Sequence, residues 1–562
     1  MPVIRFDVRE LERLLDKPVD RDELATTIPM LGADIDHVEG DDWAVEFFPD
    51  RPDLFTVEGI ARALRAWYGL APGLSAYSAA PASSHVTVEK AVEAVRPFIA
   101  CAWVRGVTIT QARLDALIDL QEDLHWGLGA RRRRVAIGIH DASVLAPPFT
   151  YKAVKLDEHP FVPLQETREM TPRQILADHP KGKDYAHLLA GHDEVPLIVD
   201  NNGGVVSLPP IINADRTSVT TATRDLFLDV TGTDEWAVMR TLNLLATTLA
   251  EAGGQLESVE VRRADGTLTT PLLAAEVRQL SVAETNALLG TTFDADEVAS
   301  RLRRMGYGAA PSASADGPGG SDEAVAVEVP CYRSDILHAW DLIEDVAIGH
   351  GIDTFDFAPT RAPTSGAWLP ENDLAEDARE SLVGLGYLEA MSLALSNERD
   401  QFVRMRRAPT PVVRVKNPVT EDHTLLRPAL LPNLLMMLRK NAHRDLPQRV
   451  FEVGMVSHID ADGQVVEARH VAGAIIAGRS NFSEMKGVVQ ALARDLGWEG
   501  DITIGRDAAF YPGRCAQWAD KGAFGEVHPE VLAAFGLSHP VAAFEFMLAP
   551  GPREHVRGPG DA

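Results

Sequence analysis

Mixed runs of strand-like and helix-like sequence, separated by glycine- and proline-rich segments, indicate a multidomain α+β fold. At 562 residues, the chain should hold about three to five domains, because domains commonly have about 100–200 residues. Residues 1–75 predict a small α/β domain in which the helices Val8–Leu15 and Leu54–Tyr68 flank a hairpin. Asp53 is the expected N-cap of the second helix. The Ala-, Ser- and Pro-rich residues 70–84 predict a linker.

Three further blocks follow along the chain. Residues 86–265 combine buried strands with a long apolar helix and predict one α+β domain. Residues 270–352 run strand, helix, helix, loop, strand and helix, and their polar, low-complexity residues 309–324 predict a flexible surface loop. Residues 360–552 alternate helices with β-rich segments, which predicts an antiparallel sheet with flanking helices.

The chain is strongly acidic. Its formal net charge is -28, from 82 acidic and 54 basic residues, of which only 10 are lysines. Adaptation to high salt, in which carboxylates keep a surface hydrated, is the favoured interpretation, and a basic partner is the alternative. Since the acids are spread over the whole length, local basic patches could still bind a nucleic acid.

Cysteine use and hydropathy indicate a cytoplasmic protein. Cys101, Cys331 and Cys515 lie far apart in the sequence, so neither a disulfide framework nor a zinc site is indicated. A reducing compartment suits three isolated thiols. The N-terminus lacks the apolar core of a signal peptide, and no run of about 18 apolar residues predicts a membrane helix. We therefore expect no membrane partner.

Common enzyme motifs are missing. The sequence contains no GxxxxGK[ST] loop, HExxH or GxSxG motif, and no GxGxxG between a strand and a helix. His140 and Asp141 are adjacent, and neighbours in sequence rarely pair as a base with its orienting acid, so a structural role is favoured. Arginine binds phosphate with a planar fork, and two clusters could do so or could be solvated turns: Arg131 to Arg134, and Arg404, Arg406 and Arg407.

One helical segment carries an unusual set of acids. Asp341, Glu344 and Asp345 fall at i, i+3 and i+4, so they share one face of a helix and repel each other. Asp335 lies just upstream, and the rest of the segment is apolar. Carboxylates are hard ligands that can bind Mg²⁺. A chance cluster in an acidic chain is the alternative.

Six segments in order resemble the beta-subunit family of phenylalanyl-tRNA synthetases, in its shorter archaeal and eukaryotic form. They are FFPDRPDLFTVEGIARAL (47–64), SLPPIINADRTSVT (207–220), VPCYRSDILHAWDLIEDVAIGHGID (329–353), NPVTEDHTLLRPALLPNLL (417–435), RVFEVG (449–454) and GEVHPEVL (525–532). The resemblance implies four domains. These are B1-like (1–75), B3/B4-like editing (86–265), winged-helix-like B5 (270–352) and class II synthetase-like, without catalysis (360–552).

The resemblance also implies a reaction and its partners. Phenylalanine would be joined to tRNA(Phe) with ATP at an alpha subunit, in an assembly of two alpha and two beta chains. Mg²⁺ shared with the alpha subunit is expected at Asp335, Asp341, Glu344 and Asp345. This chain would also hydrolyse mischarged Tyr-tRNA(Phe), with Asn213, Ser218 and Asp229 as candidate editing residues, although turn caps or strand-end polar groups explain them equally well.

Two alternatives remain open at this stage. A free-standing tRNA-binding protein or aminoacyl-tRNA deacylase would work without an alpha subunit. A structural assembly protein, whose acids at 335–345 are only halophilic surface, would respond neither to Mg²⁺ nor to a partner. The synthetase-like residues 360–552 disfavour the lone deacylase, which has no need of that additional bulk.

Overall fold

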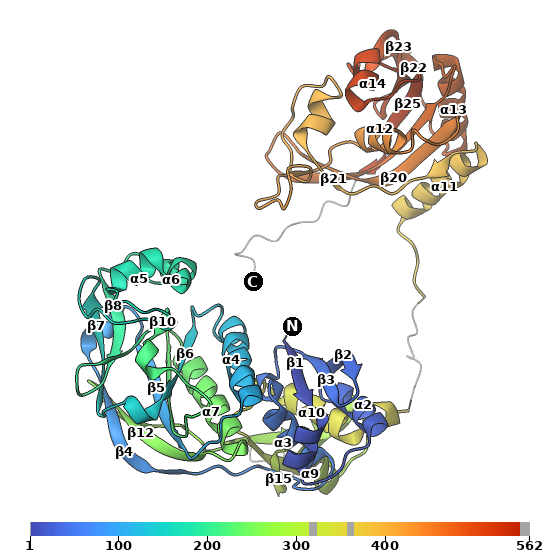
Figure 1. Cartoon of the computed structure of the whole chain (residues 1–562). Helices are drawn as coiled ribbons and strands as arrows, with labels where there is room; N and C mark the ends of the chain where they lie inside the picture. Colours follow the sequence, from blue (N-terminus) through green and yellow to red (C-terminus); the bar gives the residue numbers. More distant parts are fainter. Residues whose placement is uncertain (1, 314–322, 357–364, 551–562) are drawn as a thin grey trace. The chain divides into compact units, whose positions relative to one another are not determined.

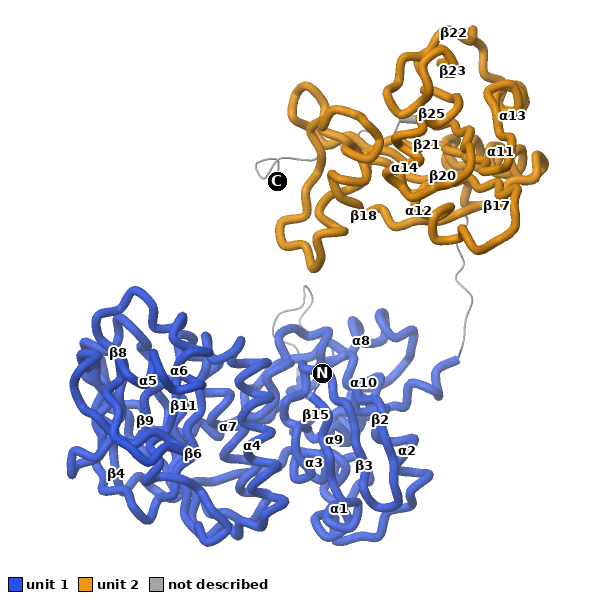
Figure 2. The backbone as a smooth tube through the Cα atoms, turned by 45° about the horizontal axis from the view of Figure 1, so that its top comes forward, with its two compact units in different colours: residues 1–358 blue, residues 359–562 orange. Residues whose placement is uncertain are grey.

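The computed structural model describes residues 2–313, 323–356 and 365–550. These residues form two compact units, 1–358 and 359–562 (Figures 1 and 2), and each is described by itself. None of the helices in the described ranges is long and apolar enough to span a membrane.

The first unit begins with a three-stranded sheet of order β1-β3-β2, flanked by helices. Its elements are β1 (Val3–Asp7), α1 (Val8–Leu15), α2 (Arg21–Met30), β2 (Ala33–Glu39), β3 (Asp42–Phe47), η1 (Pro52–Leu54) and α3 (Val57–Trp67). The bounds of α1 are those predicted. Helix α3 starts three residues later than predicted, because Thr56 caps it and accepts a hydrogen bond from the Gly59 N–H. Asp53 instead lies in η1 and binds Arg51.

A curved ten-stranded sheet follows, with the path β10-β9-β8-β7-β4-β12-β5-β11-β6 and β13 paired to β12. Its strands are β4 (Ala79–Val88), β5 (Phe98–Arg105), β6 (Val135–Asp141), β7 (Phe149–Lys155), β8 (Glu194–Val199), β9 (Val205–Leu208), β10 (Ile212–Asn213), β11 (Leu226–Gly232), β12 (Gln255–Arg263) and β13 (Gly266–Thr270). The linker prediction for residues 70–84 is wrong from Ala79 onward, because β4 pairs there in parallel with β12.

Helices cover this sheet. They are α4 (Gln111–Trp126), α5 (Pro172–Asp178), α6 (Pro180–Tyr185) and α7 (Glu235–Glu251), with the short 3-10 turns η2 (Lys90–Ala94), η3 (Ala142–Val144), η4 (Ala186–Leu188) and η5 (Asp215–Thr217). The apolar helix α7 begins at the cap Asp234, whose side chain accepts from the Ala237 N–H.

The last part of the first unit is a small sheet of order β14-β16-β15 with three helices. Its elements are β14 (Glu276–Ser281), α8 (Val282–Leu289), α9 (Ala295–Arg304), β15 (Gly308–Ala313), β16 (Glu323–Val329), α10 (Ala339–His350) and η6 (Ile352–Thr354). The loop predicted at 309–324 is wrong at both ends, where β15 and β16 pair. Its remaining residues, 314–322, lie outside the described ranges.

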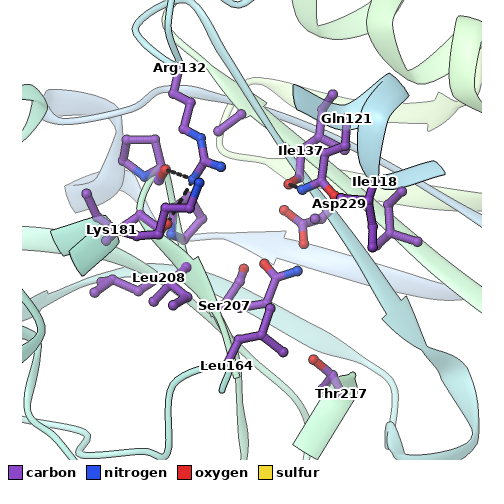
Figure 3. Close-up of a pocket in the computed structure, with 18 of the residues that line it drawn as sticks. Ile118, Gln121, Arg132, Ile137, Leu164, Lys181, Ser207, Leu208, Thr217 and Asp229 are labelled. Atoms are coloured by element: carbon purple, nitrogen blue, oxygen red, sulfur yellow. Dashed lines mark hydrogen bonds between the residues drawn. The ribbon is translucent and has the colours of Figure 1, made fainter. Parts of the chain in front are cut away.

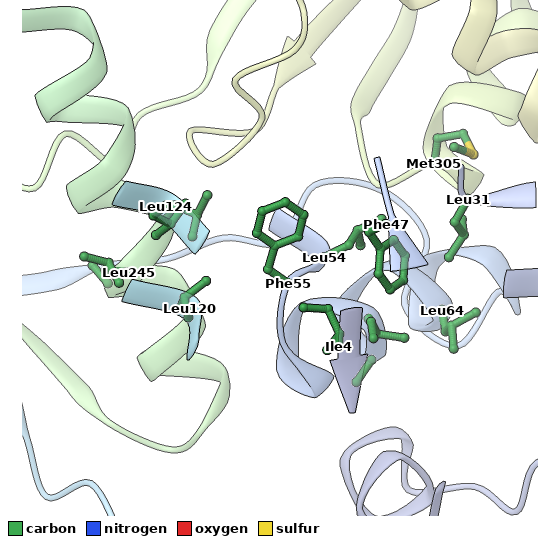
Figure 4. Packing of buried hydrophobic residues seen from close by; sticks show 14 of the residues in the cluster. Ile4, Leu31, Phe47, Leu54, Phe55, Leu64, Leu120, Leu124, Leu245 and Met305 are labelled. Atoms are coloured by element: carbon green, nitrogen blue, oxygen red, sulfur yellow. The ribbon is translucent and has the colours of Figure 1, made fainter. Parts of the chain in front are cut away.

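One hydrophobic core joins these parts of the first unit. Figure 4 shows Leu54, the last residue of η1, and Phe55, which follows it, between the N-terminal sheet and helices α4 and α7. Leu120 and Leu124 of α4 and Leu245 of α7 belong to the same buried cluster. Because burial of apolar surface stabilises the fold, these predicted domains pack as one body. Their exact boundaries at 75, 86, 265 and 270 stay predictions.

The second unit is an antiparallel sheet with flanking helices, as predicted. Its strand order is β17-β20-β21-β25-β24-β23-β22, and only β17 runs parallel to its neighbour. Its elements are α11 (Pro370–Gly384), β17 (Leu388–Glu389), β18 (Leu395–Ser396), the π-helix η7 (Arg399–Val403), β19 (Leu425–Leu426), α12 (Leu431–Lys440), β20 (Gln448–Ile459), β21 (Val465–Ile476), α13 (Phe482–Asp495), β22 (Ile502–Ile504), β23 (Phe510–Trp518), β24 (Gly522–Val527), α14 (Pro529–Phe535) and β25 (Val541–Pro550).

Candidate functional site

A cavity of about 520 Å³ lies in the ten-stranded sheet region, beside α4 (Figure 3). Strands β6 and β11 line one side of it, and β9 and β10 line another. These pairs stand at opposite ends of the strand order, so curvature of the sheet brings its two ends to one cavity. This size suits a small-molecule site.

The cavity wall is mainly apolar, with a few polar groups. The apolar side chains include Leu114, Leu117, Ile118, Ile137, Ile139, Leu164, Leu208, Ile211, Ile212 and Val219. The polar residues of most interest are Ser207, Asn213, Thr217, Ser218 and Asp229. Such a wall fits an amino-acid-sized ligand that has both an apolar body and hydrogen-bonding groups.

A buried polar contact beside the cavity joins Asp229 of β11 to His140 of β6. His140 Nε2 lies 2.6 Å from Asp229 Oδ2, and His140 Nδ1 lies 2.9 Å from Thr217 Oγ1. His140 and Asp229 are 0% and 2% exposed. A buried polar pair of this kind is stabilising only when its hydrogen bonds are made, and both imidazole nitrogens have partners here.

The three predicted editing residues line this one cavity, but they differ in their contacts. Ser218 donates its hydroxyl to the Asp215 carbonyl at 2.6 Å, so it also closes a turn. Asn213 lies in the short strand β10, where its backbone pairs with Ser207. Asp229 is held by His140. These positions leave the editing roles of all three as predictions.

Sequence reasoning missed three residues of this site. His140 does not pair with Asp141, in agreement with the sequence argument, but it binds Asp229, 89 residues along the chain. Thr217 completes that contact. The buried Ser207 has an Oγ with no hydrogen-bond partner in the described structure, and it lines the cavity. One sequence signal could have indicated His140. In the strand VAIGIHD, side chains two residues apart share a face, so Gly138 and His140 lie on the same side.

Arg132 supports the cavity wall. It is buried, and it donates to the carbonyls of Pro210 at 3.4 Å and Ile211 at 2.9 Å and to Glu122 at 2.7 Å. Arg134 pairs with Asp234. This arginine run therefore has a structural role at two of its four positions.

The second arginine cluster is also neutralised. Arg404 pairs with Asp400 at 2.7 Å, Arg406 with Glu530 at 2.9 Å, and Arg407 with Asp507 at 3.2 Å through Nε. A guanidinium already engaged by a carboxylate is a weaker phosphate ligand. The cluster is therefore not a free basic patch.

Three of the four acids predicted to bind metal make hydrogen bonds with Arg333 or at the start of α10. Arg333 donates to Asp335 at 2.6 and 2.8 Å and to Asp345 at 2.7 Å. Asp341 accepts from the backbone N–H groups of residues 337 and 338. Glu344 has a raised pKa because it is partly buried and lies near other carboxylates. An arginine and a helix N-terminus thus offset much of the expected repulsion.

These acids do not form a complete metal site in this chain alone. Within the described ranges, no three His, Cys, Asp or Glu side chains lie close enough to hold a metal ion. Arg333 occupies the space between Asp335 and Asp345 as a cation would. The donor set as it stands therefore does not fit Mg²⁺, and metal binding at these residues stays a prediction.

Family comparisons agree with this architecture. The phenylalanyl tRNA synthetase beta chain CLM domain matches residues 356–548, the tRNA synthetase B5 domain residues 278–352 and the B3/4 domain residues 105–250. The chain is 45% identical over 561 residues to the phenylalanine–tRNA ligase beta subunit of Archaeoglobus fulgidus, covering 98% of each chain. It is 42% identical to that of Methanothrix thermoacetophila, covering 98% of this chain and 100% of the relative.

A solved structure resembles a large part of the chain. It is an N-terminal fragment of the phenylalanyl-tRNA synthetase beta subunit from Pyrococcus horikoshii, at a TM-score of 0.58 and 33% identity. The match covers 62% of this chain and 100% of the fragment. It extends over a share of the chain similar to that of the first compact unit.

Proposed function

Since this chain belongs to the phenylalanine–tRNA ligase beta-subunit family, we propose that it supports ATP-dependent charging of tRNA(Phe) with L-phenylalanine. Synthesis takes place at an alpha subunit, and two chains of each kind make the assembly. The observation that carries this proposal is 45% identity over nearly the full length of both chains. A cytoplasmic location accords with three buried, unpaired cysteines.

An exposed apolar stretch in the second unit supports the proposal that this chain binds a partner chain. Leu388 is 73% exposed, Met391 93% and Leu393 63%, and they lie at or just after β17, at one end of the sheet. Met391 and Leu393 are two residues apart, as side chains on one face of an extended segment are. Contiguous exposed apolar groups mark interaction surfaces, and the alpha subunit is the proposed occupant.

The cavity of the first unit supports an editing function. Its apolar wall accommodates an aromatic ring, and Asp229 and Ser207 offer hydrogen bonds to a hydroxyl group. A site built to bind a hydroxyl strongly rejects the analogue without it, because its buried polar groups would then stay unpaired. We therefore propose hydrolysis of Tyr-tRNA(Phe) here, with Asn213, Ser218 and Asp229 contacting the substrate.

Aminoacylation measured in high salt tests the main proposal. The chain, its alpha partner and the mixture of the two are each given tRNA(Phe), ATP and phenylalanine. Charging by the mixture alone is the expected result. An inactive mixture, combined with hydrolysis of Tyr-tRNA(Phe) by this chain alone, would instead favour the free-standing deacylase.

Members of this family use Mg²⁺, and we propose that Asp335, Asp341, Glu344 and Asp345 contribute to its binding only together with the alpha subunit. The incomplete donor set of this chain supports that view. Titration with Mg²⁺ should raise the melting temperature of the complex more than that of the chain alone. An equal rise in the two, or no effect of Asp341→Asn with Glu344→Gln, would contradict a shared site.

A further inference from the structure

We propose that His140 is a positioning residue that fixes the Asp229 carboxylate in the cavity, so that one oxygen is held by the protein and the other faces the ligand. This inference rests on the proposed editing function. Figure 3 shows the Asp229 side chain at the cavity, which Ser207 also lines. Asp229 Oδ2 is held by His140, and Oδ1 has no hydrogen-bond partner in the described part of the chain.

A chain of hydrogen-bonded side chains stands behind Asp229. Thr217 Oγ1 lies 2.9 Å from both His140 Nδ1 and the Ala214 carbonyl oxygen. Because Thr217 engages Nδ1, the ring orientation is fixed, and Nε2 points at Asp229 Oδ2, 2.6 Å away. Oδ2 is committed to this contact, and Oδ1 is left for a donor from the cavity.

Packing prevents His140 from leaving this position. Its ring centre lies 6.2 Å from that of Phe227, which belongs to a buried aromatic group with Trp103 and Phe149. Both nitrogens are engaged and the side chain is fully buried. A side chain fixed by packing and two hydrogen bonds can hold a neighbouring carboxylate in one orientation.

Gly138 provides the space for this pair. A Cβ added at Gly138 would lie 2.2 Å from Asp229 Oδ2 and 2.5 Å from His140 Nε2. Gly138 pairs directly with Asp229 in the β6–β11 ladder, and its φ needs no left-handed conformation. The glycine is thus required by the contact between the two side chains and not by the backbone.

The fixed carboxylate favours ligands that place a hydrogen-bond donor opposite Asp229 Oδ1 in the cavity. The hydroxyl of tyrosine is such a donor, and the phenylalanine ring is not. With phenylalanine bound, Asp229 Oδ1 would be buried against an apolar ring, which is costly. His140 would therefore act on discrimination through Asp229, without touching the substrate.

Three variants of the full chain, assembled with the alpha subunit, test this role. His140→Phe removes both nitrogens but keeps a planar ring, whereas His140→Gln keeps a polar group near the Nε2 position. Gly138→Ala displaces the pair and leaves its chemistry intact. We expect Tyr-tRNA(Phe) hydrolysis to fall about 10- to 100-fold in His140→Phe and Gly138→Ala, the range for lost hydrogen bonds to a charged group. His140→Gln should recover most of the rate.

Aminoacylation and melting temperature serve as controls, together with Gly487→Ala, whose added Cβ would meet nothing within 4 Å. Charging with phenylalanine should be unchanged in every variant. A second measurement, binding of free L-tyrosine against L-phenylalanine, should lose its preference for tyrosine in His140→Phe.

The outcomes separate the two proposals. A wild-type assembly that charges phenylalanine but neither hydrolyses Tyr-tRNA(Phe) nor prefers tyrosine would overturn the editing function and this inference with it. Wild-type hydrolysis that His140→Phe leaves intact would overturn the positioning role alone. If hydrolysis is lost in His140→Phe and not recovered in His140→Gln, His140 has only a structural role. That result would also overturn the positioning role.

Discussion

At the residue scale, buried charges in this acidic chain are matched by specific partners. Arg427 donates to Glu452 at 2.7 Å, and Ser392 donates to the other Glu452 oxygen at 2.6 Å. Both members of the ion pair are buried. Removing one member leaves the other charge buried without its partner, which is far more costly than losing an exposed pair.

We therefore expect Arg427→Met to lower the free energy of unfolding by about 3–5 kcal/mol. Chemical denaturation of the full chain measures this loss. Adding Glu452→Met should recover part of it, because the unpaired charge is then removed. The exposed pair Arg414–Glu398 is the control: Arg414→Met should cost less than about 1 kcal/mol. Equal costs at the two positions would refute the burial argument.

His125 predicts a pH dependence at the same scale. Burial lowers the pKa of His125 to about 4, from an ordinary value of 6.5, and its Nε2 accepts from the Ile137 N–H at 2.9 Å. Between these pH values the unfolded chain binds a proton that the folded chain does not. The contribution of His125 to the free energy of unfolding is therefore fully present above pH 6.5. It is lost as the pH drops toward 4, by on the order of 3 kcal/mol in total.

Denaturation at pH 7 and pH 4.5, for wild type and His125→Gln, tests this prediction. The variant lacks the titrating group, so it should lose less stability on acidification. Burial raises the pKa of Asp123 to about 6, so its contribution to the free energy of unfolding changes with pH in the opposite direction. Asp123 is present in both proteins, so this contribution does not distinguish them. The same acid-induced loss in both would show that His125 titrates normally.

At the element scale, helix α3 depends on a glycine. A Cβ at Gly59 would lie 1.9 Å from the Asp53 backbone carbonyl, so α3 and η1 are in direct contact there. Gly59→Ala should destabilise the chain by about 1–3 kcal/mol or more, because a backbone atom would have to move. Gly487→Ala in the exposed interior of α13 should instead stabilise by up to about 1 kcal/mol. Thermal unfolding measures both, and shifts of the same sign would reject the contact argument.

Local signals predicted elements well where local chemistry decides them. Helix α1 has the predicted bounds, and Gly290 ends α8 in a left-handed conformation, as its position after the apolar run indicates. The failures came from long-range contacts. Asp53 has the chemistry of a cap, but Arg51 engages it. Strand β4 has the composition of a linker, yet its backbone pairs with β12, about 175 residues later.

At the scale of the whole molecule, the candidate site was predictable only in part. Asp229 was visible as an acid in an apolar strand. Its partner His140 was not, because the pairing depends on adjacent strands β6 and β11 that lie about 90 residues apart. Arg333 was missed for a related reason: its binding to Asp335 and Asp345 requires the turn that leads into α10. Sequence spacing reports which side chains share a helix face, but not which cation lies between them.

The partner surface gives the last prediction at this scale. Met391→Asp should leave the stability of the isolated chain within about 0.5 kcal/mol of wild type, because an exposed side chain loses little on substitution. In the complex, the carboxylate would be buried without a partner, so the affinity for the alpha subunit should fall by about 2 kcal/mol or more, roughly 30-fold. Ile504→Asp is the control, since Ile504 is 85% exposed on β22, at the opposite end of the sheet. Titration calorimetry with the alpha subunit measures both affinities. If Met391→Asp and Ile504→Asp bind it equally well, the stretch after β17 does not form the interface, and the alpha subunit must contact another face of the chain.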